Sequence, residues 1–161
     1  MIKLCALDTS TSSTGIAIFH NGKYYSSTVL QTDKKIKGDD KLNQMIEFIY
    51  SYLLKEKPEI VLTETVAVTR NVASTRMLQE LTGAVRGYCV DKGIDYVSLR
   101  PSEWRAQVVR VYQNKPAGRK REDQKAWSLD IVNNKMNIET TSDDEADAIC
   151  LGIGYLNMFG G

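Results

Sequence analysis

The chain has 161 residues, of which 42% are hydrophobic and 25% charged, and a formal net charge of +1 at pH 7. This length predicts a single domain over residues 1–161, and no apolar run approaches the roughly 18 residues of a membrane helix. Asp8 interrupts the first apolar run too early for a secretory signal, so we expect a cytoplasmic protein without a membrane segment.

The first elements predicted along the chain are three strands. The segment IKLCALD is almost continuously apolar, as in a central strand covered on both faces, and it ends in Asp8. A polar turn leads to GIAIF, and Asn21-Gly22 then stands between that run and YYSSTVLQ. Asn-Gly between two such runs indicates a hairpin, because both residues tolerate positive φ. We therefore expect an antiparallel meander.

A helix and a fourth strand follow. Apolar residues recur at helical spacing from Asp40 onward, with Asp39 and Asp40 as expected N-terminal caps. Lys57-Pro58 ends this helix, because proline lacks the backbone donor that a helix needs. EIVLTE then predicts a short buried strand that ends in Glu64.

The second half of the chain alternates helices with one more strand. A second helix is predicted to begin near Asn71 and to end at Lys92-Gly93, and IDYVSL is the fifth strand. A short helix starts at residues 101–103. A further helix runs through Trp127, and the last one begins at Ser142.

This order of elements predicts an α/β protein with a mixed five-stranded sheet flanked by helices. Strand-helix-strand crossovers make the first, fourth and fifth strands parallel neighbours. Asp8 and Glu64 then end parallel strands and should lie side by side at one edge of the sheet. The arrangement resembles the RNase H-like fold.

The start of the last helix is rich in acidic residues. Its sequence is SDDEADA, and Ser142 with Glu145 fits a capping box. Capping does not account for Asp147, which lies three residues after Asp144 and so projects from the same helical face. We expect that face to meet the sheet.

Four carboxylates would thus come together, namely those of Asp8, Glu64, Asp144 and Asp147. They would repel strongly unless cations lay between them, and oxygen-only ligands suit Mg²⁺ or Mn²⁺. Two such ions about 4 Å apart can activate water and stabilise the leaving oxygen in phosphodiester cleavage. We predict that all four residues are catalytic and bind metal. Asp8 bridges two ions, Glu64 and Asp144 each hold one, and Asp147 completes the site or positions the water.

The small net charge hides a local basic excess between Arg100 and Lys125. These residues flank Pro116-Ala117-Gly118, which indicates a mobile basic loop, and a basic loop of this kind is suited to binding phosphates. The residues that we predict to contact phosphates are Arg105, Lys115, Arg119, Lys120, Arg121 and Lys125.

Together these motifs resemble the RuvC family of Holliday-junction resolvases over most of the chain. The family opens with a strand that carries aspartate, a short polar turn and Thr-Gly, and here Asp8, Thr14 and Gly15 stand at that spacing. Other similar positions are Arg70, Asn71, Ser74, Leu78 and Gly83 after Glu64, Pro101-Ser102 after the fifth strand, and Asp144-Glu145-Ala146-Asp147-Ala148, which is similar to the family's Asp-x-Ala-Asp-Ala signature.

The resemblance implies a homodimer that binds branched DNA and hydrolyses phosphodiester bonds at four-way junctions. It adds Arg70, Asn71 and Arg76 to the residues expected to contact DNA. A basic residue near the family's site contributes to catalysis, and Lys120 and Lys125 are the candidates here.

Two positions depart from the family pattern. Thr9-Ser10 replaces a Pro-Gly found in many cellular members, and Ala67 replaces an aromatic wedge after the glutamate. Such divergence resembles a phage-encoded member. The preferred substrate stays open among a four-way junction, a Y-fork and a flap.

Two other classes of function remain as alternatives. The run LDTSTSSTG also resembles the phosphate loop of actin-like sugar kinases and of related tRNA-modification scaffolds. Those proteins generally need a second domain, and they give no reason for Asp144 and Asp147. The third reading is an inactive module that binds branched DNA, although all four carboxylates are present.

Overall fold

The first three strands form the antiparallel half of a sheet. In the computed structural model, which describes residues 2–160, Asn21 and Gly22 turn the chain with φ of 49° and 78°. This confirms the predicted hairpin. The strands are β1 (Lys3–Asp8), β2 (Ser13–His20) and β3 (Lys23–Gln31), each antiparallel to the next.

Two further strands extend the sheet on the other side of β1. β4 (Ile60–Glu64) is parallel to β1, and β5 (Asp95–Leu99) is parallel to β4. The resulting order is β3-β2-β1-β4-β5, which confirms the predicted mixed five-stranded sheet. Because Leu7 pairs with Thr63, the next residues along each strand, Asp8 and Glu64, end at the same edge.

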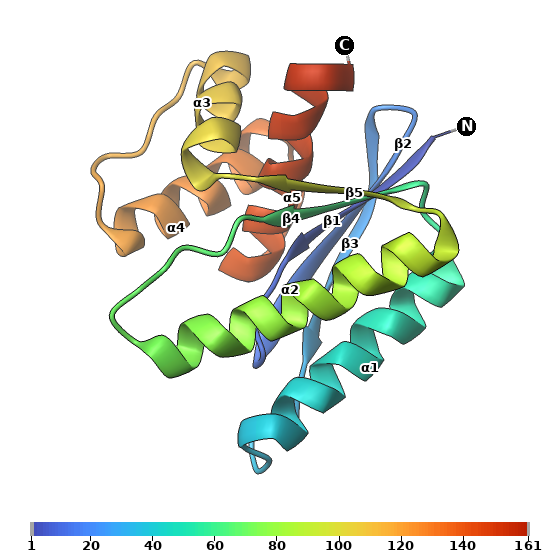
Figure 1. The fold of residues 1–161 in the computed structure, drawn as a ribbon. Helices are drawn as coiled ribbons and strands as arrows, with labels where there is room; N and C mark the ends of the chain where they lie inside the picture. Colours follow the sequence, from blue (N-terminus) through green and yellow to red (C-terminus); the bar gives the residue numbers. More distant parts are fainter. Residues whose placement is uncertain (1, 161) are drawn as a thin grey trace.

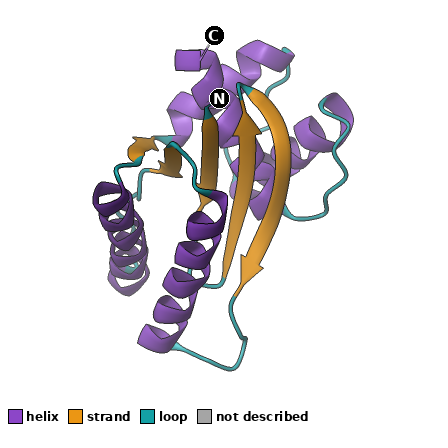
Figure 2. Cartoon of the chain, turned by 90° about the vertical axis from the view of Figure 1, so that its right-hand side faces the viewer, coloured by secondary structure: helices purple, strands orange, loops and turns teal. Residues whose placement is uncertain are grey.

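Helices cover both faces of this sheet (Figures 1 and 2). α1 (Gly38–Glu56) and α2 (Val72–Lys92) lie on one face. The other face carries α3 (Pro101–Tyr112), α4 (Arg121–Asp130) with its π-helical continuation η1 (Ile131–Lys135), and α5 (Asp143–Tyr155), which runs into η2 (Leu156–Gly160). Within residues 2–160, none of the helices has the length and apolar character needed to cross a membrane.

The apolar side chains of β1 belong to two separate hydrophobic cores, one on each face of the sheet. Leu4 and Ala6 face α3, α4 and α5, whereas Cys5 and Leu7 face α1 and α2. Side chains alternate between the faces of a strand, so a strand with helices on both faces must be apolar at every position. This is why the sequence of β1 shows no alternation.

Local helix ends differ from the sequence predictions at three places. The N-cap of α1 is Lys37, and Asp39 and Asp40 lie in the first turn without capping it, so the predicted caps were wrong. Ser142 does cap α5, but the Glu145 side chain accepts from the Thr140 and Ser27 hydroxyls and does not complete a capping box.

The third difference is the length of α3. The predicted short helix at residues 101–103 continues to Tyr112. Trp104 and Val108, one helical turn apart, are both fully buried, and α3 packs chiefly against α5. A single buried turn was too weak a pattern to predict among the surrounding charges.

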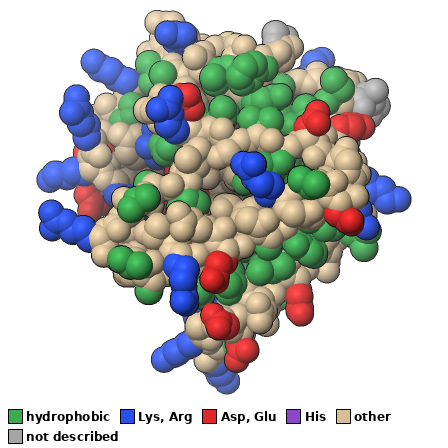
Figure 3. Space-filling model, viewed as in Figure 1, with side chains coloured by type: hydrophobic (Ala, Val, Ile, Leu, Met, Phe, Trp, Pro, Cys, Tyr) green, Lys and Arg blue, Asp and Glu red, His purple; other side chains and the backbone are tan. Residues whose placement is uncertain are grey.

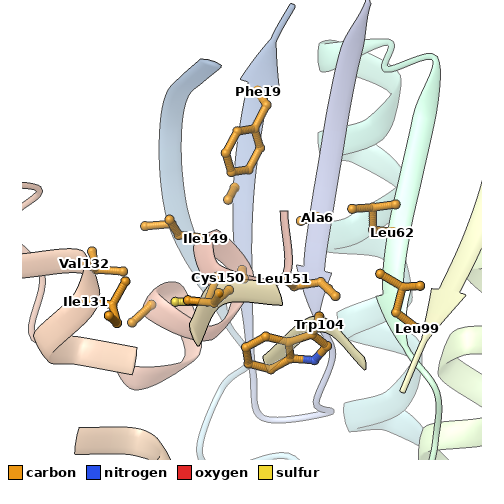
Figure 4. Packing of buried hydrophobic residues seen from close by; sticks show 14 of the residues in the cluster. Ala6, Phe19, Leu62, Leu99, Trp104, Ile131, Val132, Ile149, Cys150 and Leu151 are labelled. Carbon is orange, nitrogen blue, oxygen red and sulfur yellow. The ribbon is translucent and has the colours of Figure 1, made fainter. Parts of the chain in front are cut away.

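Glycines allow α5 to lie directly on β2. A Cβ atom built on Gly15 would stand 1.9 Å from the carbonyl oxygen of Asp144, and one built on Gly152 would stand 2.1 Å from the Phe19 ring. Phe19 and the α5 side chains pack in one cluster (Figure 4). Because Asp8 pairs with Gly15 across β1 and β2, this contact brings the start of α5 to the end of β1.

We expect Gly15→Ala to lower the free energy of unfolding by about 1–3 kcal/mol, because the added methyl group would force α5 away from β2. Gly83→Ala is the matched control, since a Cβ there meets nothing within 4 Å on the exposed face of α2. The control should be neutral or stabilising by up to about 1 kcal/mol. Urea unfolding measures both, and equal effects would contradict the close contact.

Candidate active site

A cavity of about 770 Å³ opens at the edge of the sheet where β1 and β4 end. All four predicted carboxylates line it. Asp8 comes from the end of β1, Glu64 from the end of β4, and Asp144 and Asp147 from the first turns of α5. The structure thus brings together side chains that are far apart in the sequence, at the strand ends where open α/β sheets commonly bind ligands.

Neighbouring serines hold the two α5 carboxylates. The Ser13 hydroxyl on β2 donates to Asp144 Oδ2 at 2.7 Å. The Ser128 hydroxyl on α4 donates to Asp147 Oδ1 at 2.5 Å. Each bond fixes one carboxylate oxygen and restricts rotation of the side chain, while Oδ1 of Asp144 and Oδ2 of Asp147 accept neither bond.

Trp104 holds the third carboxylate. Its indole N–H donates to Glu64 Oε2 at 3.0 Å. The Trp104 side chain is fully buried (Figure 4), and a Cβ on Gly154 of α5 would lie 2.8 Å from its Cβ. The close contact with α5 therefore fixes the indole that orients Glu64.

Burial and neighbouring charges shift the pKa values of Asp8, Asp147 and Glu64. Burial raises the pKa of Asp8 well above its usual value, and the negative charges of Asp147, Asp144 and Glu64 raise it further. Burial also raises the pKa of Asp147 to about 6 and raises that of Glu64, although the positive charge of Arg105 opposes both shifts. A site of this kind gains free energy from any cation that enters it.

The residue types in the cavity fit a divalent cation. The ligands are oxygen only, which suits Mg²⁺ or Mn²⁺, and the negative charges of Asp147, Asp144 and Glu64 add to burial in raising the pKa of Asp8. Among residues 2–160, however, no three acidic, histidine or cysteine side chains are gathered tightly enough to hold an ion as they stand. Coordination would therefore require the carboxylates to turn toward a common point.

Cationic side chains surround the carboxylates. Of the predicted basic set, Arg105, Arg119, Arg121 and Lys125 line the cavity, and Lys41 of α1 joins them. Figure 3 shows Lys and Arg side chains gathered along the left edge, where Figure 1 places the α3–α4 loop and the start of α4.

The two candidates for a basic residue near the site differ in position. Lys125 lines the cavity, and its Nζ lies 2.8 Å from Asp143 Oδ2. Lys120 occupies the N-cap position of α4 and does not line the cavity. The Arg105 guanidinium lies 4.8 Å from the centre of the Trp104 ring, stacked on the same indole that holds Glu64.

The other residues predicted to contact DNA lie outside the lining of this cavity. Arg70, Asn71, Arg76 and Lys115 are all exposed. Asn71 has a structural role as well, because its Oδ1 accepts the Ser74 backbone N–H at 3.0 Å and caps α2.

Sequence reasoning missed the residues that position the carboxylates. Ser13 lies in a polar run, and nothing in the sequence distinguishes it from the neighbouring serines and threonines. Ser128 follows Trp127 in a helix that mixes polar and apolar residues, so no pattern there points to a contact with a carboxylate. For Trp104 a signal existed, since an indole N–H inside a protein generally needs a hydrogen-bond acceptor. Lys41 could not be linked to the site from the sequence, because its place in the cavity wall depends on where α1 begins in the folded chain.

The order of the strands and the flanking helices define the RuvC/RNase H-like fold. A structure of Thermus thermophilus RuvC in complex with a Holliday-junction substrate matches with a TM-score of 0.72 and 14% identity, over 98% of this chain and 94% of that one. The yeast mitochondrial Holliday-junction resolvase Ydc2 matches with a TM-score of 0.64 and 14% identity, over 96% and 77% respectively.

A second T. thermophilus RuvC structure matches with a TM-score of 0.68 and 14% identity, over 97% of this chain and 94% of that one. These likenesses confirm the predicted resemblance at the level of the fold. No protein-family model and no curated protein matches the sequence.

The pKa of Asp147 leads to a prediction about stability. An acid whose pKa is higher in the folded state holds its proton more tightly there, so the free energy of unfolding falls as pH rises from about 4 to about 6 and stays lowered above that. In EDTA, Asp147→Asn should therefore stabilise the protein near neutral pH, on the order of 2 kcal/mol, and have little effect near pH 4.

Thermal unfolding of both proteins at the two pH values measures this difference. Asp95→Asn, at the exposed start of β5, is the matched control and should not change with pH relative to the wild type. If the difference in thermal stability between Asp147→Asn and the wild type is the same at both pH values, ionisation of Asp147 is not what lowers the stability of the folded protein.

Proposed function

We propose that this protein is a metal-dependent endonuclease that hydrolyses DNA phosphodiester bonds at Holliday junctions or other branched DNA. One observation carries the proposal: the ends of β1 and β4 and the start of α5 contribute four carboxylates to one cavity, with cations around them. A fold similar to that of a RuvC bound to a Holliday-junction substrate supports it.

In the proposed site, Asp8, Glu64, Asp144 and Asp147 would hold two Mg²⁺ or Mn²⁺ ions. Such ions, when bound, activate water and stabilise the leaving oxygen in phosphodiester hydrolysis. The protein contributes orientation and charge. Donors from Ser13, Ser128 and Trp104 each hold one oxygen of Asp144, Asp147 and Glu64 and would limit how far these carboxylates turn when an ion enters.

The proposed DNA path runs over the basic side of the cavity. The positive charge of Arg105 opposes the rise in the pKa values of Asp147 and Glu64, and Arg119, Arg121 and Lys125 extend the positive surface. Phosphates attract such side chains and fix the register of the DNA without reading its sequence. We further propose that residues 1–161 act as one domain and that two copies pair on a junction.

Metal-dependent cleavage tests the proposal. In Mg²⁺ or Mn²⁺, but not in EDTA, the purified protein should nick labelled four-way junctions, Y-forks or flaps. Asp8→Asn should lower cleavage by at least about a hundredfold. It should preserve or tighten DNA binding, because it removes a negative charge that repels phosphate. Asp95→Asn serves as the control and should cut normally.

Two results would contradict this assignment. Joint loss of cleavage and DNA binding in Asp8→Asn, with the fold intact, would give Asp8 a structural role. A wild-type protein that binds branched DNA but cuts none of these substrates with either metal would instead be an inactive binding module.

A further inference from the structure

An ion pair lies in the wall of the cavity, beside the four carboxylates. The Lys125 Nζ of α4 is 2.8 Å from Asp143 Oδ2 in the first turn of α5, and both residues line the cavity. Among residues 2–160, Lys125 forms no ion pair with any of the four carboxylates of the proposed metal site. Asp143 is thus a fifth acidic residue of the cavity, and it alone pairs with the lysine.

The helices α4 and α5 are joined by two side-chain contacts in register. Lys125 and Ser128 lie three residues apart on α4 and so project from one face of it, about 4.5 Å apart along the helix axis. One turn apart on α5, Asp143 pairs with Lys125 and Asp147 accepts from the Ser128 hydroxyl. Because the stem of a lysine is flexible, rotation of the Lys125 side chain can carry its ammonium from Asp143 toward Asp147.

The carboxylate cluster attracts any cation that can move toward it. Burial and neighbouring negative charges raise the pKa values of Asp8 and Asp147. A lysine ammonium among these carboxylates would relieve their repulsion as a metal ion does, and it would occupy the space that the ion needs. Arg105 is held from such a movement, because its guanidinium is stacked 4.8 Å from the centre of the Trp104 ring. Lys125 has only Asp143 to hold it.

We propose that Asp143 is a positioning residue that keeps Lys125 out of the carboxylate cluster and so keeps that cluster open to divalent cations. This inference rests on the proposed function, in which the cluster binds metal. The Lys125 and Asp143 side chains are 39% and 31% exposed, so the ammonium has an anionic partner there while it keeps part of its water. Entry into the cluster would remove that water, which is costly for a charged group.

Stability alone gives little reason for this ion pair, since partly exposed pairs contribute little to the free energy of unfolding. The chain has a comparable pair in Lys3 and Glu56, with 3.1 Å between Nζ and Oε2 and side chains that are 24% and 21% exposed. Lys3 lies at the opposite end of β1 from Asp8, and neither partner lines the cavity. The Lys3–Glu56 pair is therefore a matched control.

Mn²⁺ binding in the absence of DNA tests the proposal through a double-mutant cycle. Electron paramagnetic resonance measures the free ion while the protein is titrated. Asp143→Asn should weaken Mn²⁺ binding about tenfold, because Lys125 then turns into the cluster. Lys125→Met should change the affinity by less than about twofold in the wild type, where Asp143 already holds the lysine away, but should tighten it about tenfold in the Asp143→Asn background.

Two further variants are controls. Asp143→Glu keeps the carboxylate, and Glu56→Gln removes only the control ion pair, so both should bind Mn²⁺ as the wild type does. Simple attraction and repulsion between charges gives a different pattern, in which Lys125→Met tightens binding equally in both backgrounds. Equal effects, or a loss in Asp143→Asn that Lys125→Met does not reverse, would overturn the role of Asp143.

A crystal structure of Asp143→Asn grown in EDTA tests the position of Lys125 without metal. Its Nζ should lie within hydrogen-bond distance of a carboxylate oxygen of Asp144 or Asp147. A lysine that stays beside position 143 or extends into solvent would overturn the inference. A wild type that binds no Mn²⁺, together with a Lys125 that enters the cluster in the variant, would instead contradict the proposed metal-dependent function alone.

Discussion

The close contact between α5 and β2 is the constraint on which the rest of this structure depends. Gly15 has no side chain to keep the backbone of Asp144 away, and it pairs directly with Asp8 on β1. One contact therefore sets the distance between the end of the first strand and the start of the last helix. The same helix contacts Trp104 closely at Gly154. Because the Trp104 indole donates to Glu64, the position of α5 also affects the position of Glu64.

That constraint has an electrostatic cost. Packing α5 so closely places the Asp144 and Asp147 carboxylates near Asp8, where their negative charges add to burial in raising the pKa of Asp8. The Ser128 hydroxyl offsets part of this cost, since its hydrogen bond to Asp147 favours the charged form of that carboxylate and lowers its pKa. The fold thus gathers negative charge at one edge of its sheet, and the cationic side chains around the cavity only partly balance it.

The sequence predicted those elements of the fold that depend on residues close together in the chain. The apolar runs that end in Asp8 and Glu64 predicted both strands and the shared edge, because the carboxyl ends of parallel neighbours coincide. The length of α3 and the role of Trp104 depend on what the helix packs against, which no window of sequence contains. The catalytic roles of the four carboxylates stay a prediction.

The assembly of the carboxylates from β1, β4 and α5 also affects biosynthesis. A ribosome releases β1, β2 and β3 early, and their hairpins can pair at once because the contacts are local. Two of the four carboxylates then arrive only with α5, more than half of the chain later. A nascent chain bearing the finished antiparallel strands would hold only Asp8 of the four carboxylates, and no cavity. Synthesis itself therefore delays the appearance of a complete site until the last helix has docked.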